Sequence, residues 1–306
     1  MFRLFRKTLK VCTHDGDFHP DEVFACAALS LWAKREGYKL KIIRSRDDKD
    51  IKNADIVVDI GMQYDPDKNI FDHHQGKGAG ARDNVPYASF GLVWKKYGPE
   101  ICSSNEIAGR IENKLVMSID ALDNGVNTIK VVKPEIRDHR THDAIDHFNL
   151  TYQEDPSLSY KQFKRVLNFA GEILVREITW EKALMDSKIE TLKAIKEQNE
   201  PEILILDKEL NWHEAVSKND KIKFIVYPKK ERTEWRVQPG KNNLEDFSSN
   251  RVKFPKGWWG LRGEELVQIS GVKRAIFCHK GGWLAVTKTR EGAIEMAEKA
   301  LQNSRN

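Results

Sequence analysis

The chain has 306 residues, of which 40% are hydrophobic and 32% are charged, and its formal net charge is +5. This is an ordinary globular balance, and the length suffices for two domains. No apolar run approaches the ~18 residues that span a bilayer, and the four cysteines form no CxxC pair, which excludes a zinc ribbon.

The N-terminal segment MFRLFRKTLKVC is basic but lacks the apolar region of a secretory signal. We interpret it as a lead-in to the first strand rather than as a targeting segment. The scattered cysteines fit a reducing interior. We therefore expect a cytoplasmic protein that contacts no membrane, and a mitochondrial or nuclear location is the alternative for a eukaryotic source.

Strands and helices alternate in the first half of the chain. A helix is expected from Pro20 to Gly37, with Asp21 and Glu22 in its first turn, and further helices at 87–97 and 104–122. Strands are expected at 8–13, 39–44, 54–61 and 70–74. This alternation predicts an α/β fold whose N-terminal domain has a doubly wound, mostly parallel sheet.

The second half begins with a weaker pattern. Charges accumulate between 126 and 158, which indicates a linker or lid, and a long amphipathic helix is expected across 160–198. Strands at 203–206, 224–228, 234–238, 275–279 and 283–287 and a last helix at 290–302 predict a smaller α/β or α+β domain. The expected division is 1–130 for a metal-binding domain, 131–200 for the linker and long helix, and 201–306 for a substrate-binding domain.

Acidic and imidazole side chains follow the apolar runs of the first half in four clusters. These are residues 14–22, Asp59, residues 72–74 and residues 120–125. The carboxyl ends of parallel strands meet at one crevice, where converging carboxylates would repel one another unless a cation neutralised them. A mixed set of histidines and carboxylates suits manganese or a similar first-row ion better than calcium, and two such ions ~4 Å apart serve phosphoryl chemistry.

Each of these residues taken singly also has a structural explanation. His14 or His19 alone would more often cap a helix, and Asp59 alone could form a turn. The joint pattern of four clusters in order favours a metal site.

Five segments carry a resemblance to a known family. They are THDGDFHPDEVFACA (13–27), ADIVVDIGMQYDP (54–66), FDHHQ (71–75), YASFGLVWKKYG (87–98) and SIDALDNG (118–125). Together they resemble the melanocyte-proliferating-gene (Myg-one) exonuclease family of the DHH phosphoesterase superfamily. The resemblance continues through FIVYP (224–228), WRVQ (235–238), WWGLRGEEL (258–266) and 269–297, and so covers nearly the whole chain.

The resemblance implies a DHH-like fold and a manganese-dependent phosphodiesterase, which in the eukaryotic relatives is a 3′-to-5′ RNA exonuclease. It implies two Mn²⁺ ions, with Mg²⁺ or Co²⁺ as alternatives. The implied metal ligands are His14, His19, Asp21, Asp59, His73 and Asp120, and the implied catalytic residues are Asp59, His74 and Asp123.

Some choices within this set stay open. His74 is either a ligand or a phosphate contact, and either Asp120 or Asp123 completes the set. The superfamily's first motif often has two aspartates one residue apart, where this chain has His19 and Asp21. Asp15 and Asp17 are therefore alternative contributors.

The second half offers residues for an anionic substrate. In the segment 279–282 (HKGG), two glycines would let the backbone approach an anion closely, although a plain hairpin turn is an equal explanation. Trp258 and Trp259 could stack on a base, and burial in the core is the commoner explanation. The expected substrate-binding residues are His74, Arg262, His279, Lys280, Gly281, Gly282, Lys288 and Arg290.

The function expected from all these features is hydrolysis of phosphodiester bonds in RNA or a short oligonucleotide. One alternative is a small-substrate phosphoesterase that cleaves oligonucleotides or phosphoanhydrides in a tighter cleft. A second is a non-catalytic, metal-containing nucleic-acid binder, which the many acidic and histidine groups disfavour. The net charge does not distinguish RNA from DNA, and the sequence indicates no oligomeric state.

Overall fold

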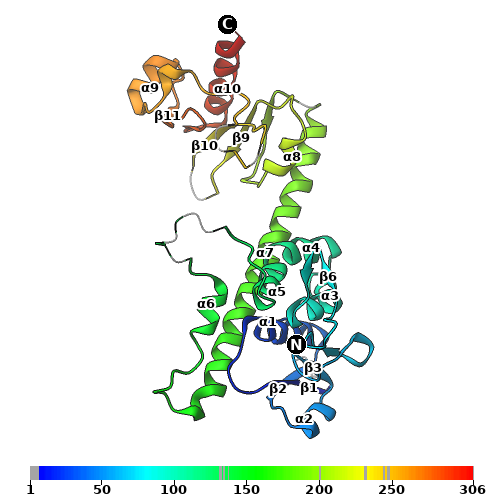
Figure 1. Ribbon diagram of the computed structural model, residues 1–306. Helices are drawn as coiled ribbons and strands as arrows, with labels where there is room; N and C mark the ends of the chain where they lie inside the picture. Colours follow the sequence, from blue (N-terminus) through cyan, green and yellow to red (C-terminus); the bar gives the residue numbers. More distant parts are fainter. Residues whose placement is uncertain are drawn as a thin grey trace. The chain divides into compact units, whose positions relative to one another are not determined.

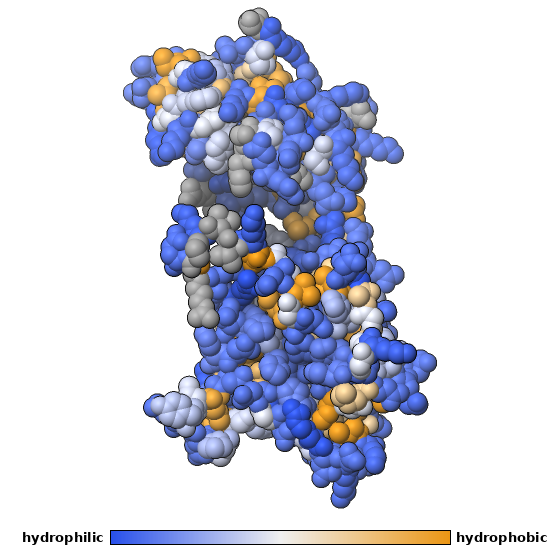
Figure 2. Space-filling view, in the orientation of Figure 1, coloured by the Kyte–Doolittle hydropathy of each residue, from blue (hydrophilic) through white to orange (hydrophobic). Residues whose placement is uncertain are grey.

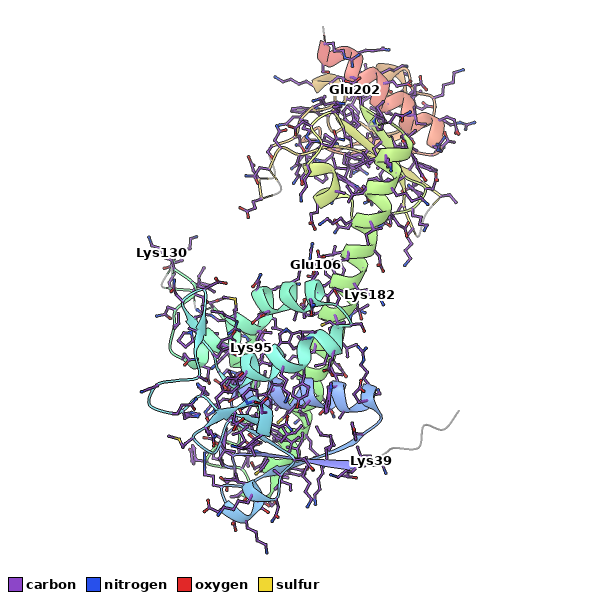
Figure 3. All side chains as sticks on the ribbon, turned by 90° about the vertical axis from the view of Figure 1, so that its right-hand side faces the viewer. Lys39, Lys95, Glu106, Lys130, Lys182 and Glu202 are labelled. Atoms are coloured by element: carbon purple, nitrogen blue, oxygen red, sulfur yellow. The ribbon has the colours of Figure 1, made fainter. Side chains whose placement is uncertain are left out.

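The computed structural model describes residues 7–130, 133, 135–136, 138–199, 201–230, 233–243, 245–246 and 249–305. The first six residues of the basic lead-in and part of the expected linker lie outside this set. The chain divides into two compact units, Met1–Lys182 and Ala183–Asn306. The division falls inside helix α7 (Ser159–Glu197), at the residue labelled Lys182 in Figure 3. The three-part division with boundaries at 130/131 and 200/201 stays a prediction.

The sheet of the first unit is mostly parallel, as expected. Its strand order is β2-β1-β3-β5-β4, and only β4 runs antiparallel to its neighbour. The strands are β1 (Thr8–Thr13), β2 (Lys39–Arg44), β3 (Ile56–Val58), β4 (Tyr64–Asp65) and β5 (Ile70–Phe71). The strand β3, Ile-Val-Val, is buried throughout, which fits a central parallel strand covered on both faces.

Helices of the first unit pack together beside this sheet (Figure 1). Helix α1 (Pro20–Glu36) contacts α3 (Ser89–Cys102), α5 (Met117–Asp123) and the strands β2 and β3. Gly37, with φ 81°, ends α1 in the left-handed conformation that glycine adopts easily. The expected helix at 104–122 is present in three parts: α4 (Asn105–Ile111), a π-helical segment η2 (Glu112–Val116) and α5.

Several short elements were not expected. In the first unit they are β4, α2 (Asp48–Lys52), the strands β6 (Ala81–Arg82) and β7 (Val85–Pro86), the 3₁₀ turns η1 (Pro66–Lys68) and η3 (Pro156–Leu158), and α6 (Thr141–Asp146), which lies within the expected linker. No described helix is sufficiently long and apolar to cross a lipid bilayer.

The second unit is built on a mostly antiparallel sheet of order β11-β12-β10-β9-β8, in which only β8 and β9 are parallel. The sheet carries a core on each face. Phe224 and Val226 of β9 point into one core, and Ile225 and Tyr227 point into the other, as the two-residue period of a strand requires. The strands are β8 (Ile203–Ile205), β9 (Phe224–Pro228), β10 (Trp235–Pro239), β11 (Ala275–Cys278) and β12 (Ala285–Thr287).

Helix α10 (Arg290–Arg305) packs across all five of these strands, and α9 (Gly263–Ser270) contacts β11. The opposite core contains Ile195 of α7 and Val216 of α8 (His213–Ser217), and a short 3₁₀ turn η4 (Lys256–Trp258) precedes α9. Figure 2 shows hydrophobic residues in separate patches among hydrophilic ones on the face turned to the viewer.

Candidate metal centre

The ends of two neighbouring strands, β1 and β3, each position one side chain of the site. The chain runs from β1 to β2 on one side and returns to β3 on the other side of β1, so the strand order reverses between β1 and β3. Open α/β sheets bind ligands at such a point, beyond the carboxyl ends of the strands. His14 directly follows β1 and Asp59 directly follows β3, and His14 Nε2 lies 3.3 Å from Asp59 Oδ2. Asp59 has φ 57°, a left-handed conformation that aspartate tolerates better than most residues.

The imidazole of His14 is oriented by its backbone neighbour. His14 Nδ1 lies 2.9 Å from the carbonyl oxygen of Asp15, which can only accept, so Nδ1 carries the proton. In the neutral ring Nε2 then directs a lone pair at Asp59 and at Glu22 Oε1, 3.4 Å away. Burial lowers the pKa of His14, but the hydrogen bond to Asp59 and the charge of Glu22 raise it more. The lone pairs of His14 Nε2, Asp59 Oδ2 and Glu22 Oε1 thus face one another, and a proton or a cation is needed between these atoms.

The first turn of α1 supplies two buried carboxylates. The backbone N–H of His19 donates to both oxygens of Glu22 at 2.9 Å, an arrangement typical of a helix start. Burial raises the pKa of Glu22 to about 8, although the charge of His14 opposes the rise. Asp21 is fully buried, and its pKa is raised well above the usual range by burial and then by the charges of Asp59 and Asp123. Asp21 Oδ1 has no hydrogen-bond partner among the described residues, so this oxygen is left for a cation.

The side chains after β5 complete the cluster. His73 Nε2 lies 3.4 Å from Asp59 Oδ1, 3.2 Å from Asp123 Oδ2 and 3.9 Å from Asp21 Oδ2. His74 is half exposed, and its Nδ1 lies 2.8 Å from Asp72 Oδ1. Asp72 itself is buried and also accepts from the backbone N–H of Met62, so it orients the His74 ring.

Three overlapping groups of ligand atoms result, and the atoms within each group lie within 4.8 Å of one another. Asp59 belongs to two groups and His73 to two, so the groups form one connected site rather than separate ones. The groups are His14, His19, Glu22 and Asp59; Asp59, His73 and His74; and Asp21, His73 and Asp123. Imidazole and carboxylate donors grouped in this way could hold divalent metal ions.

Asp59 is the electrostatic centre of this site. Burial alone would raise the pKa of Asp59, but hydrogen bonds from the protonated rings of His14 and His73 and from the hydroxyl of Ser89 hold it well below its usual range. The hydroxyl of Ser89 donates to Asp59 Oδ1 at 2.8 Å. Asp59 therefore stays ionised while the surrounding carboxyls of Asp21 and Asp123 have raised pKa values.

The assignment of Asp120 as a metal ligand does not fit this geometry. Its carboxylate lies 2.8 Å from Arg82 Nη1 and accepts the backbone N–H of Gly91 at 3.0 Å. A Cβ at Gly91 would lie 1.9 Å from Asp120 Oδ2, so the carboxylate is packed tightly against α3. Of the two alternatives, the structure thus brings Asp123 to the cluster and ties Asp120 to Arg82.

Two predicted alternatives, Asp15 and Asp17, lie outside the cluster, and two residues that were not predicted lie within it. Asp15 and Asp17 are exposed, and Asp15 pairs with Arg46 at 3.3 Å, so neither joins the described ligand groups. Glu22 and Ser89 belong to the cluster although neither was singled out from the sequence. Glu22 carried a weak signal, since it lies in the first cluster, whereas an isolated serine carries none.

A cavity of about 430 Å³ opens on the cluster. His14, His19, Asp59 and His74 are among its lining residues, together with residues 60–62 and Asp72. Arg46 is the only lysine or arginine in the lining found among the described residues. The cavity therefore offers both the candidate metal ligands and one cation for an anionic group.

The predicted substrate residues of the second half lie in the second unit. The segment 279–282 lies in the connection, residues 279–284, between the antiparallel strands β11 and β12. Gly282 has φ 65°, and a Cβ there would lie 2.3 Å from Trp259 Nε1, so packing against an indole is sufficient reason for this glycine. Lys280, Lys288 and Arg290 are exposed, and the guanidinium of Arg262 lies 4.5 Å from the Phe277 ring centroid. Trp258 is buried in the core, which is incompatible with its stacking on a base.

The sequence is similar to known proteins along most of its length. The model of the family MYG1_exonuc, described as "Uncharacterised protein family (UPF0160)", matches residues 10–301. A "MYG1 protein" of Dictyostelium discoideum is 33% identical over an alignment that covers 97% of each chain. The "MYG1 exonuclease" of Homo sapiens is 29% identical, over 95% of this chain and 85% of that relative.

Similarity to solved structures is weaker. A structure of RecJ from Thermus thermophilus in complex with Mn²⁺ gives a TM-score of 0.30 at 11% identity, over 97% of this chain and 52% of that one. This chain thus spans about half the length of that protein.

Proposed function

The chain belongs to the MYG1 exonuclease family, and from this premise we propose that it is a Mn²⁺-dependent phosphodiesterase that degrades RNA from its 3′ end. The single observation that carries the proposal is the position of Asp59. This buried carboxylate belongs to two of the three ligand groups and has histidines from two different strand ends beside it.

We assign the residues to two ion positions. His14, His19, Glu22 and Asp59 would hold one ion, and Asp59, His73, Asp21 and Asp123 would hold the other. Divalent ions bound there would lower the pKa of water and polarise a phosphoryl oxygen. Ser89 would keep the shared carboxylate of Asp59 in place through its 2.8 Å hydrogen bond.

His74 and Arg46 have separate roles in this proposal. The hydrogen bond from His74 Nδ1 to Asp72 leaves Nε2 on the opposite side of the ring, and in the protonated ring this Nε2–H would contact a phosphate or pass its proton to the leaving oxygen. Arg46 lines the same cavity and would bind a phosphate oxygen of the substrate. Asp15 holds the Arg46 side chain at the cavity.

The test compares cleavage of a labelled RNA by the wild type and by Asp59→Asn, in Mn²⁺ and in EDTA. The substitution keeps the size of the side chain but removes the shared charge, so turnover should fall by more than about 100-fold. Asp65→Asn is the matched control, because Asp65 pairs with the exposed Lys68 and belongs to no described ligand group. Full turnover by Asp59→Asn, or turnover that survives EDTA, would contradict the proposal.

The same assay separates the alternatives. RNA labelled at its 5′ or 3′ end reports the direction of degradation, and DNA of the same sequence reports the choice of sugar. Activity only on di- to pentanucleotides or on pyrophosphate would instead support a small-substrate phosphoesterase. Binding of RNA without any cleavage would support a non-catalytic binder.

A further inference from the structure

The second unit contains a partly open cavity of about 200 Å³ that the proposed chemistry does not use. Its lining combines aromatic rings with amides and a positive charge. Besides Pro239, the lining residues are Trp212, His213, Gln238, Lys241, Asn250 and Trp283, and all of them lie in Ala183–Asn306.

One pair of rings in the lining is stacked. The rings of His213 and Trp212 have centroids 3.9 Å apart and an interplanar angle of 13°. Trp212 is almost fully buried in a core of the second unit, so it fixes the position of the His213 ring. Burial, and then the charge of Lys241, lower the pKa of His213, so the imidazole is neutral at pH 7 and presents an uncharged aromatic surface.

The other indole is held by the β11–β12 turn. Trp283 is 37% exposed, and its ring centroid lies 4.2 Å from that of His279. Gly281 leaves room for this indole, since a Cβ there would lie 2.8 Å from Trp283 Cδ1. The backbone N–H of Gly281 also donates to His279 Nδ1 at 3.0 Å, which fixes the His279 ring. The turn is therefore shaped to position an accessible indole at the cavity.

Polar side chains of the lining can form hydrogen bonds with the edge of a planar ligand. The hydroxyl of Tyr227 donates to Gln238 Oε1, so the amide nitrogen of Gln238 is the group that can donate to a ligand. Asn250 adds a second amide and Lys241 a positive charge. Side-chain amides pair well with the N6 and N7 edge of adenine, and aromatic side chains stack on any base.

We propose that this cavity binds a nucleobase, stacked against Trp283 and His213 and bonded at its edge by the amides of Gln238 and Asn250. The proposal rests on the proposed function only in taking the base to be part of the RNA substrate. It assigns base recognition to the second unit, whereas the candidate metal ligands all lie in the first.

The test is calorimetric titration of the full chain in EDTA with AMP, and with ribose 5-phosphate as the ligand that lacks a base. AMP should bind at least tenfold more tightly than ribose 5-phosphate. Trp283→Ala should weaken AMP binding roughly 5- to 150-fold, the range found for loss of one base–aromatic stack. Trp283→Phe should retain most of the affinity because it keeps an aromatic face.

Trp180→Ala is the matched control, since Trp180 is a 55% exposed indole on α7 in the first unit. It should leave AMP binding unchanged, and thermal melting of each variant verifies folding. Equal binding of the two ligands, no AMP binding by the wild type, or unchanged AMP affinity in folded Trp283→Ala would each overturn the proposal. Because EDTA prevents metal-dependent cleavage, these outcomes are independent of the RNA-cleavage assay, whose failure would overturn only the proposed function.

Discussion

Asp120 and Asp123 lie three residues apart on α5, yet their carboxylates have different partners. Asp123 Oδ2 lies 3.2 Å from His73, and Asp120 pairs with Arg82. Asp123→Asn should therefore weaken Mn²⁺ binding and leave the melting temperature of the metal-free protein nearly unchanged. Asp120→Asn should leave Mn²⁺ affinity unchanged and cost roughly 2 kcal/mol of stability or more, because Arg82 loses its buried carboxylate partner and keeps only the partly exposed Glu112.

Mn²⁺ titration by calorimetry and thermal melting in EDTA measure the two effects separately. The reverse result, in which Asp120→Asn loses Mn²⁺ binding and Asp123→Asn does not, would contradict the placement of these side chains.

The protonation of the cluster makes metal binding dependent on pH. In the metal-free protein the pKa of Glu22 is about 8, and those of Asp21, Asp123, His14 and His73 are also raised. Below these pKa values the groups hold protons that a metal ion must displace, so Mn²⁺ affinity should rise with pH between 6 and 8. Each proton released corresponds to about a tenfold gain in affinity per pH unit.

Calorimetric titrations in two buffers of different ionisation enthalpy count the protons released on Mn²⁺ binding. Asp65→Asn serves as the reference, because Asp65 belongs to no described ligand group and should not alter the count. Equal affinity at pH 6 and pH 8, with no proton release, would show that these side chains do not bind the ion.

Among the individual site residues, the sequence predicted the clusters of histidines and aspartates, because these residues stand at the ends of apolar runs. It did not predict Glu22, since a glutamate in the first turn of a helix is ordinarily a cap, and Glu22 also has that role here. Nor could it choose between Asp120 and Asp123. That choice depends on the contact with Gly91, which is a tertiary contact between α5 and α3.

The short structural elements that position the site are harder to predict from the sequence than the site residues themselves. The π-helical segment η2 interrupts the helix that ends at Asp123, and its wider turn changes which residues of α5 face α3. Elements of two to five residues, such as α2 and the β6–β7 pair, are too short to show a period. Long periodic elements such as α7 were predicted nearly to their ends.

Asn149, in the loop after the unpredicted helix α6, contacts the loop that carries His19 of the candidate metal centre. Its amide nitrogen donates to the carbonyl of Phe18 at 2.8 Å, and its oxygen accepts the Phe18 N–H at 2.9 Å. This pair of bonds fixes the backbone next to His19. Asn149→Ala removes no ligand but frees this loop, so Mn²⁺ affinity should fall by roughly tenfold.

Gln153→Ala is the control for that measurement, because Gln153 is exposed and its amide bonds only to Tyr152 among the contacts described. Calorimetric titration with Mn²⁺ compares the two variants with the wild type. Wild-type affinity in Asn149→Ala would mean that the loop is held by the packing of Phe18 against Phe163 instead.

For the whole molecule, α7 is the element that belongs to both units. The candidate metal ligands lie in the first unit, and the predicted substrate residues at 262–290 lie in the second. A proline at the exposed position Ala183 would break the helix where the units divide, at a local cost of about 3 kcal/mol. Because the ligands and their core stay within Met1–Lys182, Ala183→Pro should bind Mn²⁺ as the wild type does.

Cleavage of RNA by Ala183→Pro should respond differently. If catalysis uses residues of both units, misalignment of the substrate should lower kcat/KM on the order of 100-fold, while Ala183→Ser, which keeps the helix, should retain full activity. Mn²⁺ calorimetry and RNA cleavage by the same preparation separate the two properties. Wild-type kcat/KM in Ala183→Pro would show that the metal-binding unit acts on RNA without a fixed second unit, and the residues at 262–290 would then have no part in catalysis.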